Sequence, residues 1–152
     1  MAATAEVAAR IEGYVTQLQQ EGVLDEQFRQ LMQLQDETNP DFVTEVVQLF
    51  FEDSASKIER IGVMLSAPDP DFTELDHLVH QFKGSSASLG ARMIEQLCIR
   101  LREMCGAQNS PACVMLLGQV QQCYDLLKTK LEVFMQLEAR HKQLQQQEGG
   151  HQ

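Results

Sequence analysis

His80, Lys83 and Gly84 are the residues of this chain whose types and spacing suggest chemistry. A neutral imidazole on a protein surface is a good nucleophile near neutral pH. If His80 accepted a phosphoryl group, Lys83 at i+3 would lie one helical turn away and supply a cation. Gly84 at i+4 would leave room for an approaching partner, because glycine has no side chain. The chemistry that these three residues suggest is therefore transfer of a phosphoryl group through histidine.

The element that must position them is a helix predicted from Asp71 to Ala91. Asp71 can cap its start together with Glu74, and Gly90 suits a left-handed end. A glycine inside a helix costs up to about 1 kcal/mol relative to alanine, so Gly84 calls for a reason. His80 lies roughly 140° from the centre of the apolar stripe and should face solvent. That stripe consists of Phe72, Leu75, Leu78, Val79, Phe82 and Leu89.

These residues alone leave other interpretations open. A histidine followed by lysine at i+3 is common on exposed helix faces, so His80 could be an ordinary surface residue. His77 lies one turn earlier on the same face, but its i+3 and i+4 neighbours are His80 and Gln81 rather than Lys and Gly. Two histidines at this spacing could also bind a metal, although Asp76 would be the one further ligand nearby. We expect no metal site.

The twelve residues from His80 to Ala91, His-Gln-Phe-Lys-Gly-Ser-Ser-Ala-Ser-Leu-Gly-Ala, resemble the phosphorylation segment of the plant histidine-containing phosphotransfer (HPt) proteins. These proteins are intermediates of cytokinin-type His–Asp phosphorelays. The resemblance implies that His80 accepts the phosphoryl group, with Lys83 and Gly84 beside it. Some family members carry Asn at the acceptor position, whereas this chain has His. Weaker similarity covers Leu24–Phe28, Leu34–Asp36, Pro40–Val43 and Cys98–Arg102.

The resemblance also implies the partners. A phospho-aspartate on the receiver domain of a hybrid histidine kinase would be the donor, and an aspartate on a response regulator would be the acceptor. His80 would attack in line through Nε2, and the receiver domain would supply Mg²⁺, so no cofactor of the chain's own is expected. Gln81 and Ser88 lie on or near the face that would dock. The alternative is a helical adaptor that binds receiver domains without being phosphorylated, and His80 with its two neighbours is the feature against it.

Composition excludes several other classes of protein. The 152 residues fit one domain, and a net charge of −10 argues against nucleic-acid binding. The sequence contains no signal-peptide pattern and no stretch long enough to span a membrane. It also contains no nucleotide-binding loop motif, so we expect a carrier rather than an enzyme. We further expect four reduced cysteines and a monomer, with the family implying a location in cytoplasm and nucleus.

The remaining pattern is helical throughout, and we predict an all-α fold. The bundle is expected to be an antiparallel four-helix bundle over about residues 41–143, with two additional N-terminal helices over one end or side. We expect Asn39 to cap the long helix with Pro40 in its first turn, and Asn109 or Ser110 to cap the last.

A single domain would cover residues 1–145. The Gln-rich segment from Lys142 should fray, residues 146–152 should be disordered, and His141 and His151 should be bystanders. The expected helices are Ala5–Gln20, Asp25–Gln33, Asp41–Leu65, Asp71–Ala91, Arg92–Cys105 and Ala112–Gln143.

Overall fold

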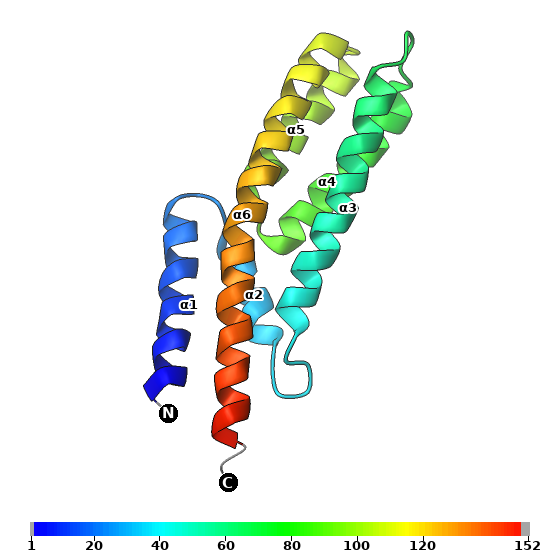
Figure 1. Ribbon diagram of the computed structural model, residues 1–152. Helices are drawn as coiled ribbons and strands as arrows, with labels where there is room; N and C mark the ends of the chain where they lie inside the picture. The colour runs from blue at the N-terminus through cyan, green and yellow to red at the C-terminus, as the bar shows by residue number, and fades with distance from the viewer. Residues whose placement is uncertain (1, 150–152) are drawn as a thin grey trace.

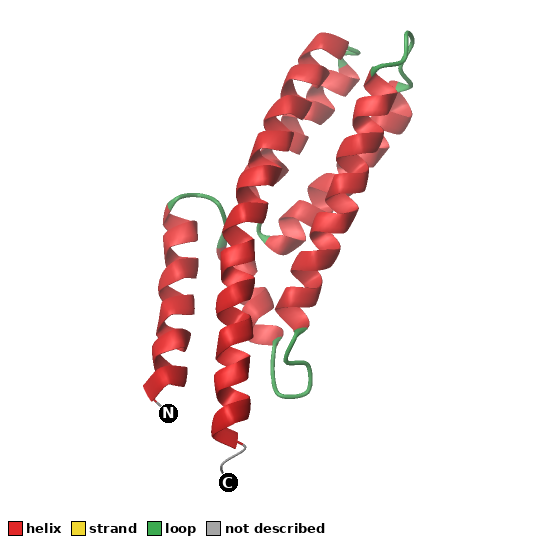
Figure 2. Ribbon diagram, in the orientation of Figure 1, coloured by secondary structure: helices red, strands yellow, loops and turns green. Residues whose placement is uncertain are grey.

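The computed structural model describes residues 2–149 and contains only helices and loops in that range (Figures 1 and 2). This confirms the all-α prediction. No helix among the described residues is long and apolar enough to cross a membrane. The helices are α1 (Ala2–Gln20), α2 (Glu26–Leu34), α3 (Phe42–Leu65), α4 (Phe72–Leu89), α5 (Arg92–Gly106) and α6 (Ser110–Gly149).

Helices α3 to α6 form the predicted four-helix bundle (Figure 1). The long helix α6 runs the whole length of the molecule, and α1 lies along its lower half. Helix α2 contacts α4 and α3 at the lower end of the bundle. The two N-terminal helices therefore extend the core beyond the bundle, as predicted. Phe28 of α2 packs edge-on against Phe134 of α6, with ring centroids 5.2 Å apart.

Helix α4 begins and ends at the predicted caps, and the residues of the predicted apolar stripe are buried except Phe72, which is half-buried near the start of the helix. The Asp71 carboxylate accepts a hydrogen bond from the Glu74 backbone N–H at 3.1 Å, which caps the first turn. Gly90 ends the helix in the left-handed conformation, with φ of +90°. One side of the helix faces the core and the other faces solvent, so the orientation of the exposed side is fixed by apolar burial. The buried side chains are Leu75, Leu78, Val79, Phe82, Ser86 and Leu89.

Gly90 also forms a hydrogen bond with the residue that precedes α2. Its carbonyl oxygen accepts a hydrogen bond from the Asp25 backbone N–H at 3.0 Å. A Cβ atom at position 90 would lie 2.8 Å from the Phe28 backbone nitrogen and 2.9 Å from Asp25 Oδ1. Only glycine meets both the positive φ and this close approach of backbone.

Side-chain caps are predicted at the starts of α3 and α6, and the structure differs from the prediction at α3. Asn39 does not cap α3, because its side-chain oxygen accepts from the Asp36 N–H at 2.8 Å within the preceding turn. Helix α3 begins at Phe42, so Pro40 lies outside it, and Gln35 Oε1 accepts from the Val43 N–H at 3.0 Å instead. The cap on α6 is Asn109, whose side chain accepts from the Ala112 N–H at 3.1 Å, as predicted.

The expected fraying from Lys142 is wrong for the described residues, because α6 continues to Gly149. The segment is held by tertiary contacts that a Gln-rich composition does not reveal. Lys142 pairs with Asp41, and Thr4 Oγ1 of α1 donates to Glu148 Oε1 at 2.6 Å. The prediction of disorder over residues 146–152 is therefore wrong for 146–149, while 150–152, with His151, lie outside the described residues. His141 is half-buried in α6.

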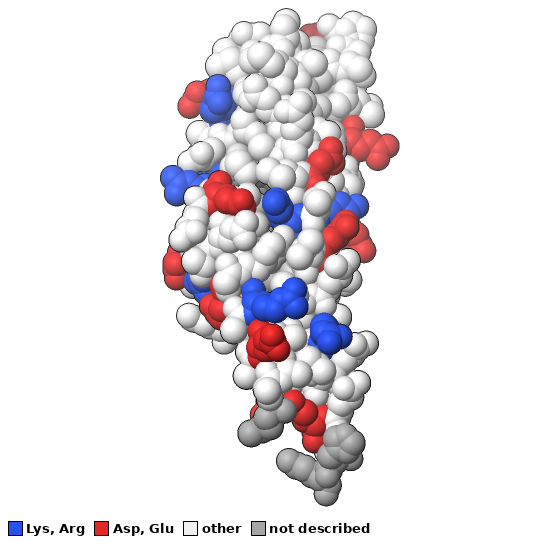
Figure 3. Space-filling view, turned by 60° about the vertical axis from the view of Figure 1, so that its left-hand side comes forward, with Lys and Arg blue, Asp and Glu red and all other residues white. Residues whose placement is uncertain are grey.

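Charged side chains of both signs are interspersed over most of the face in Figure 3, and only its top is mostly uncharged. The face in view has no continuous basic patch.

One buried polar group in the core lacks a partner. Ser54 of α3 is fully buried, and its hydroxyl makes no hydrogen bond within the described part of the chain. Ser86 of α4 is buried to the same extent, but its hydroxyl donates to the Phe82 carbonyl at 2.8 Å. The two serines thus offer a matched comparison between a satisfied and an unsatisfied hydroxyl.

We predict that Gly90→Ala lowers the free energy of unfolding by about 2 kcal/mol or more, since it adds a strained φ and a clash with the α2 backbone. Urea denaturation followed by circular dichroism measures the change. Gly13→Ala is the control: Gly13 is an exposed position of α1 with open space around it, and alanine there should raise the free energy of unfolding by about 0.5 kcal/mol. Equal effects of the two substitutions would contradict the proposed role of Gly90.

We predict that Ser54→Ala raises the free energy of unfolding by about 1 kcal/mol, because it removes an unsatisfied buried hydroxyl. Ser86→Ala should lower it by a similar amount, because a buried hydrogen bond is lost. The same denaturation experiment compares both variants with the wild type. A loss of stability in both would show that Ser54 has a partner in solution.

Candidate functional site

His80 lies in the middle of α4 with its side chain exposed to solvent. Its neighbours in sequence, Val79 and Phe82, are buried in the bundle core. The imidazole is therefore held on the outer surface by packing on the opposite side of the helix, as the sequence predicts. Helix α5 runs alongside α4 and supplies the other side of the site.

An arginine from α5 contacts the histidine ring. Arg102 Nη1 lies 3.0 Å from His80 Nδ1. The same guanidinium is held by Asp76 of α4, with Nε 3.0 Å from Oδ1 and Nη2 3.3 Å from Oδ2. This hydrogen bond with Asp76 is the main reason that the pKa of Arg102 is raised. Asp76 and His80 are four residues apart, so one guanidinium reaches both across a single turn of α4.

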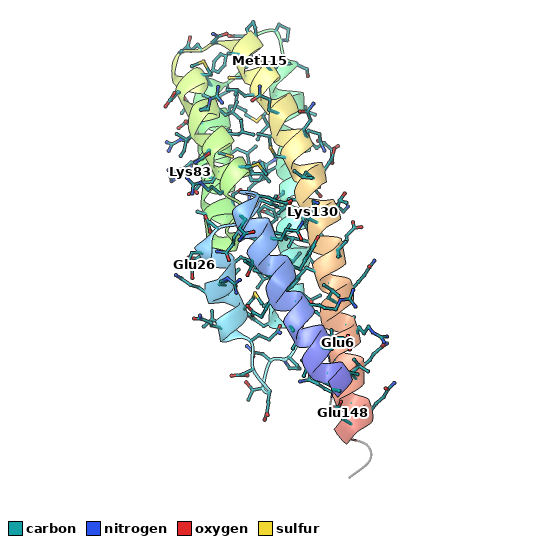
Figure 4. All side chains as sticks on the ribbon, turned by 90° about the vertical axis from the view of Figure 1, so that its left-hand side faces the viewer. Glu6, Glu26, Lys83, Met115, Lys130 and Glu148 are labelled. Atoms are coloured by element: carbon teal, nitrogen blue, oxygen red, sulfur yellow. The ribbon has the colours of Figure 1, made fainter. Side chains whose placement is uncertain are left out.

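Lys83 lies one turn beyond His80 and is half-buried. It lines a shallow hollow of about 310 Å³ between α4 and α5, together with Asp76, Ile99, Arg102 and Glu103. Figure 4 shows Lys83 on the outer side of the α4–α5 pair, above Glu26 of α2. Among residues 2–149, Lys83 forms no ion pair, so its ammonium is available to an anion at the surface. Two cations from different helices thus flank His80.

Cys98 lies on the buried side of α5, beneath this surface. Burial raises the pKa of its thiol to about 12, with the charge of Glu95 raising it further and that of Lys83 lowering it. Such a thiol is almost entirely protonated at neutral pH and is a poor nucleophile. Cys98 therefore belongs to the core, as predicted, and His80 is the exposed candidate nucleophile of this surface.

Gly84 is exposed, and a Cβ atom built there would meet no atom within 4 Å. The fold therefore does not require glycine at this position, in contrast to Gly90. What the glycine leaves open is the outer surface next to His80. Ser88 is also exposed, and its hydroxyl donates to the Gly84 carbonyl at 3.0 Å. The exposed residues Gly84 and Ser88, which follow His80 along α4, are thus small and leave the surface there unobstructed by long side chains.

Gln81 and His77 contact each other rather than His80. Gln81 Nε2 lies 3.3 Å from His77 Nε2, and both side chains are exposed. His77 has neither the arginine nor the lysine that His80 has. The arrangement therefore favours His80 over His77 as the reactive histidine.

Sequence reasoning missed Asp76 and Arg102 as parts of the site. Asp76 was considered as a weak metal ligand, and its i+4 spacing to His80 was the available signal. Arg102 gave no local signal, because it lies 22 residues from His80 in sequence. It reaches the site only because α4 and α5 pack side by side. The Cys98–Arg102 similarity to the HPt proteins was the one indication that this part of α5 matters.

A helical bundle that exposes an imidazole in contact with a guanidinium, with a lysine one turn along the same helix, has groups that could carry a phosphoryl group. The comparisons with known proteins agree. Residues 45–130 match the family model for the Hpt domain. The chain is 45% identical to histidine-containing phosphotransfer protein 5 of Arabidopsis thaliana over 135 residues, which is 88% of this chain and 86% of the relative. It is 46% identical to protein 1 of the same plant over 128 residues, covering 84% of this chain and 83% of the relative.

The fold agrees with a solved structure as well. The X-ray structure of a histidine-containing phosphotransfer protein from rice superposes with a TM-score of 0.86 at 36% identity, covering 92% of this chain and 99% of that chain. The chain therefore belongs to the family of histidine-containing phosphotransfer proteins. It is a histidine phosphotransfer intermediate of a two-component phosphorelay, and it works with other two-component proteins.

Proposed function

We propose that His80 is the residue that carries the phosphoryl group. The observation that supports this most directly is the exposed imidazole with Arg102 at 3.0 Å and Lys83 one turn away. A phosphorylated side chain carries nearly two negative charges at neutral pH, and nearby cations stabilise it. The neighbouring histidine, His77, contacts Gln81 instead of an arginine.

The donor is a phospho-aspartate on the receiver domain of a hybrid histidine kinase, and the acceptor is an aspartate on the receiver domain of a response regulator. His80 attacks the phosphorus in line through Nε2, the ring nitrogen that does not contact Arg102. Lys83 stabilises the transferred group at the surface hollow. The open surface at Gly84 lets the receiver domain approach, and exposed Gln81 and Ser88 lie within the docking face.

The chain acts as a carrier and not as a kinase. Its sequence has no Gly-x-x-x-x-Gly-Lys-Ser/Thr loop that could hold nucleotide phosphates. It needs no cofactor of its own, because the receiver domain supplies the Mg²⁺ that neutralises the phosphoryl oxygens during transfer. We further propose that it works as a monomer in both cytoplasm and nucleus, since a chain of 17.2 kDa needs no import signal to move between them.

We predict that His80→Gln abolishes transfer of label from a phosphorylated receiver domain to this protein. His77→Gln is the matched control, because it removes an exposed histidine one turn away and should leave transfer intact. The label on the wild type should be lost in acid and retained in alkali, as expected for a phosphoramidate. Label that survives in His80→Gln and disappears in His77→Gln would move the acceptor to His77.

We predict that Gly84→Ala raises the free energy of unfolding by about 0.5–1 kcal/mol, because alanine is the better helix former and has open space there. Gly84→Gln should fold as well as the wild type but slow transfer from the receiver domain roughly tenfold or more, because a long side chain displaces the partner. Thermal denaturation and single-turnover transfer measure the two effects. Unchanged transfer in Gly84→Gln would show that the partner does not approach over this turn.

A further inference from the structure

The contact between Arg102 and His80 determines which nitrogen of the resting ring carries the proton. A guanidinium has only N–H donors and stays protonated at neutral pH. The Nδ1 atom of His80, 3.0 Å from Arg102 Nη1, therefore accepts the hydrogen bond with its lone pair. In a neutral imidazole the proton then lies on the other nitrogen, Nε2. Neither nitrogen of the resting ring thus has a free lone pair, because that of Nδ1 is engaged and Nε2 carries the hydrogen.

A ring in this form cannot attack phosphorus. Attack through Nε2 needs a lone pair at Nε2, so the proton must first move to Nδ1. Arg102 opposes that move, because an N–H at Nδ1 would face a group that can only donate. In the free protein the arginine therefore lowers the reactivity of His80, although its charge suits a phosphoryl group once that group has arrived.

Asp76 keeps the guanidinium against the ring. Its carboxylate accepts from Arg102 Nε at 3.0 Å and from Nη2 at 3.3 Å, which fixes the plane of the guanidinium while Nη1 contacts His80. The side chains of Arg102 and Asp76 are 35% and 37% exposed, so an anion that arrives at the surface can reach them. The contact with the ring is thus held in the free protein and remains open to a competing acceptor.

We propose that Arg102, held by Asp76, keeps His80 in an unreactive form until a docked partner draws the guanidinium away from the ring. This inference rests on the proposed role of His80 as the phosphoacceptor. A phosphoryl group is anionic and offers several oxygens to a guanidinium, whereas the neutral ring offers one lone pair. The phosphoryl group of a docked receiver domain is therefore the stronger acceptor for Arg102. A carrier restrained in this way reacts with a docked partner in preference to other phosphoryl compounds.

The transfer step then needs no base from the protein. Once Arg102 has left Nδ1, the ring loses its Nε2 proton to water and takes up a proton at Nδ1, which frees the lone pair of Nε2. That pair forms the N–P bond, the P–O bond to the donor aspartate breaks, and its electron pair stays on the aspartate as a carboxylate. The product has the phosphoryl group on Nε2 and a proton on Nδ1, which equilibrates with solvent. Removal of the contact with Arg102 is therefore the step that must precede bond formation.

The first test is ¹⁵N NMR of the His80 ring in the free protein at about pH 8, where an ordinary exposed imidazole is neutral. The wild type should show the Nε2–H form. Arg102→Met keeps the apolar stem without a donor, and should shift the balance toward the Nδ1–H form roughly fivefold, as expected for one lost hydrogen bond. Arg100→Met is the matched control, since it changes an exposed arginine two residues away on α5. An Nδ1–H form in the wild type, or the same balance in both variants, would overturn the proposal.

The second test measures the reactivity of the same ring with diethyl pyrocarbonate. This reagent acylates unprotonated imidazole nitrogens and is uncharged, so its rate does not depend on attraction by nearby cations. Peptide mass spectrometry should find His80 acylated roughly fivefold faster in Arg102→Met than in the wild type or Arg100→Met. Asp76→Asn should give a smaller increase, because the guanidinium is held less firmly. A rate at His80 that is unchanged or slower in Arg102→Met would contradict the restraint.

The third test adds a receiver domain whose aspartate carries beryllium fluoride, a stable mimic of the phosphoryl group. His80 should change to the Nδ1–H form in the complex. A ring that stays in the Nε2–H form while the amides of Gly84 and Ser88 shift on binding would overturn the release step. Failure of the proposed function is distinguishable: label on His80→Gln would reject His80 as the acceptor, while the ring of the free protein would still report on Arg102.

Discussion

The left-handed turn at Gly90 is the constraint on which the rest of the site depends. Because only Gly90 and Ala91 separate α4 from α5, the two helices must pack antiparallel from their first shared turn. The register between them is then fixed by the distance from the turn. His80 lies ten residues before Gly90 and Arg102 twelve residues after it, so they meet on the same outer face. The close approach of α2 at Gly90 holds the turn in place from the other side.

Apolar burial sets the orientation of the site around this turn. The stripe on α4 packs into the core and leaves His80 on the solvent side, while α5 buries Cys98 and Leu101 and leaves Arg102 half-exposed. Neither helix could rotate to hide its charged residues without exposing its stripe. The chemical surface is thus a consequence of core packing and does not need an enclosed pocket. A carrier that must meet two partners in turn is well served by such an open surface.

Much of this could be predicted from the sequence, because the signals are local. The Asp71 cap, the Gly90 end and the period of the stripe placed His80 on the outer side of one helix. The residues that could not be predicted depend on contacts distant in sequence. Arg102 becomes part of the site through helix pairing, and the last turns of α6 are ordered by α1 and by Asp41 of the loop before α3. Asn39 was not predictable for a different reason. It has the residue type of a helix cap, but its side-chain oxygen accepts a hydrogen bond from the Asp36 N–H in the preceding turn.

If His80 carries the phosphoryl group as proposed, the two cations on its surface are suited to different tasks, and the difference follows from their chemistry. Lys83 is a single charge on a flexible stem, suited to a phosphoryl group whose position changes between donor, carrier and acceptor. Arg102 is a planar fork that Asp76 holds against the ring, suited to a group that must not move. Lysine in place of arginine would keep the charge but lose the fixed plane. The net charge of −10 over the whole chain does not oppose this, because exposed charges beyond about 10 Å are largely screened at physiological salt. On the proposed function, the electrostatic environment of His80 is therefore set by these two local cations more than by the overall acidity of the chain.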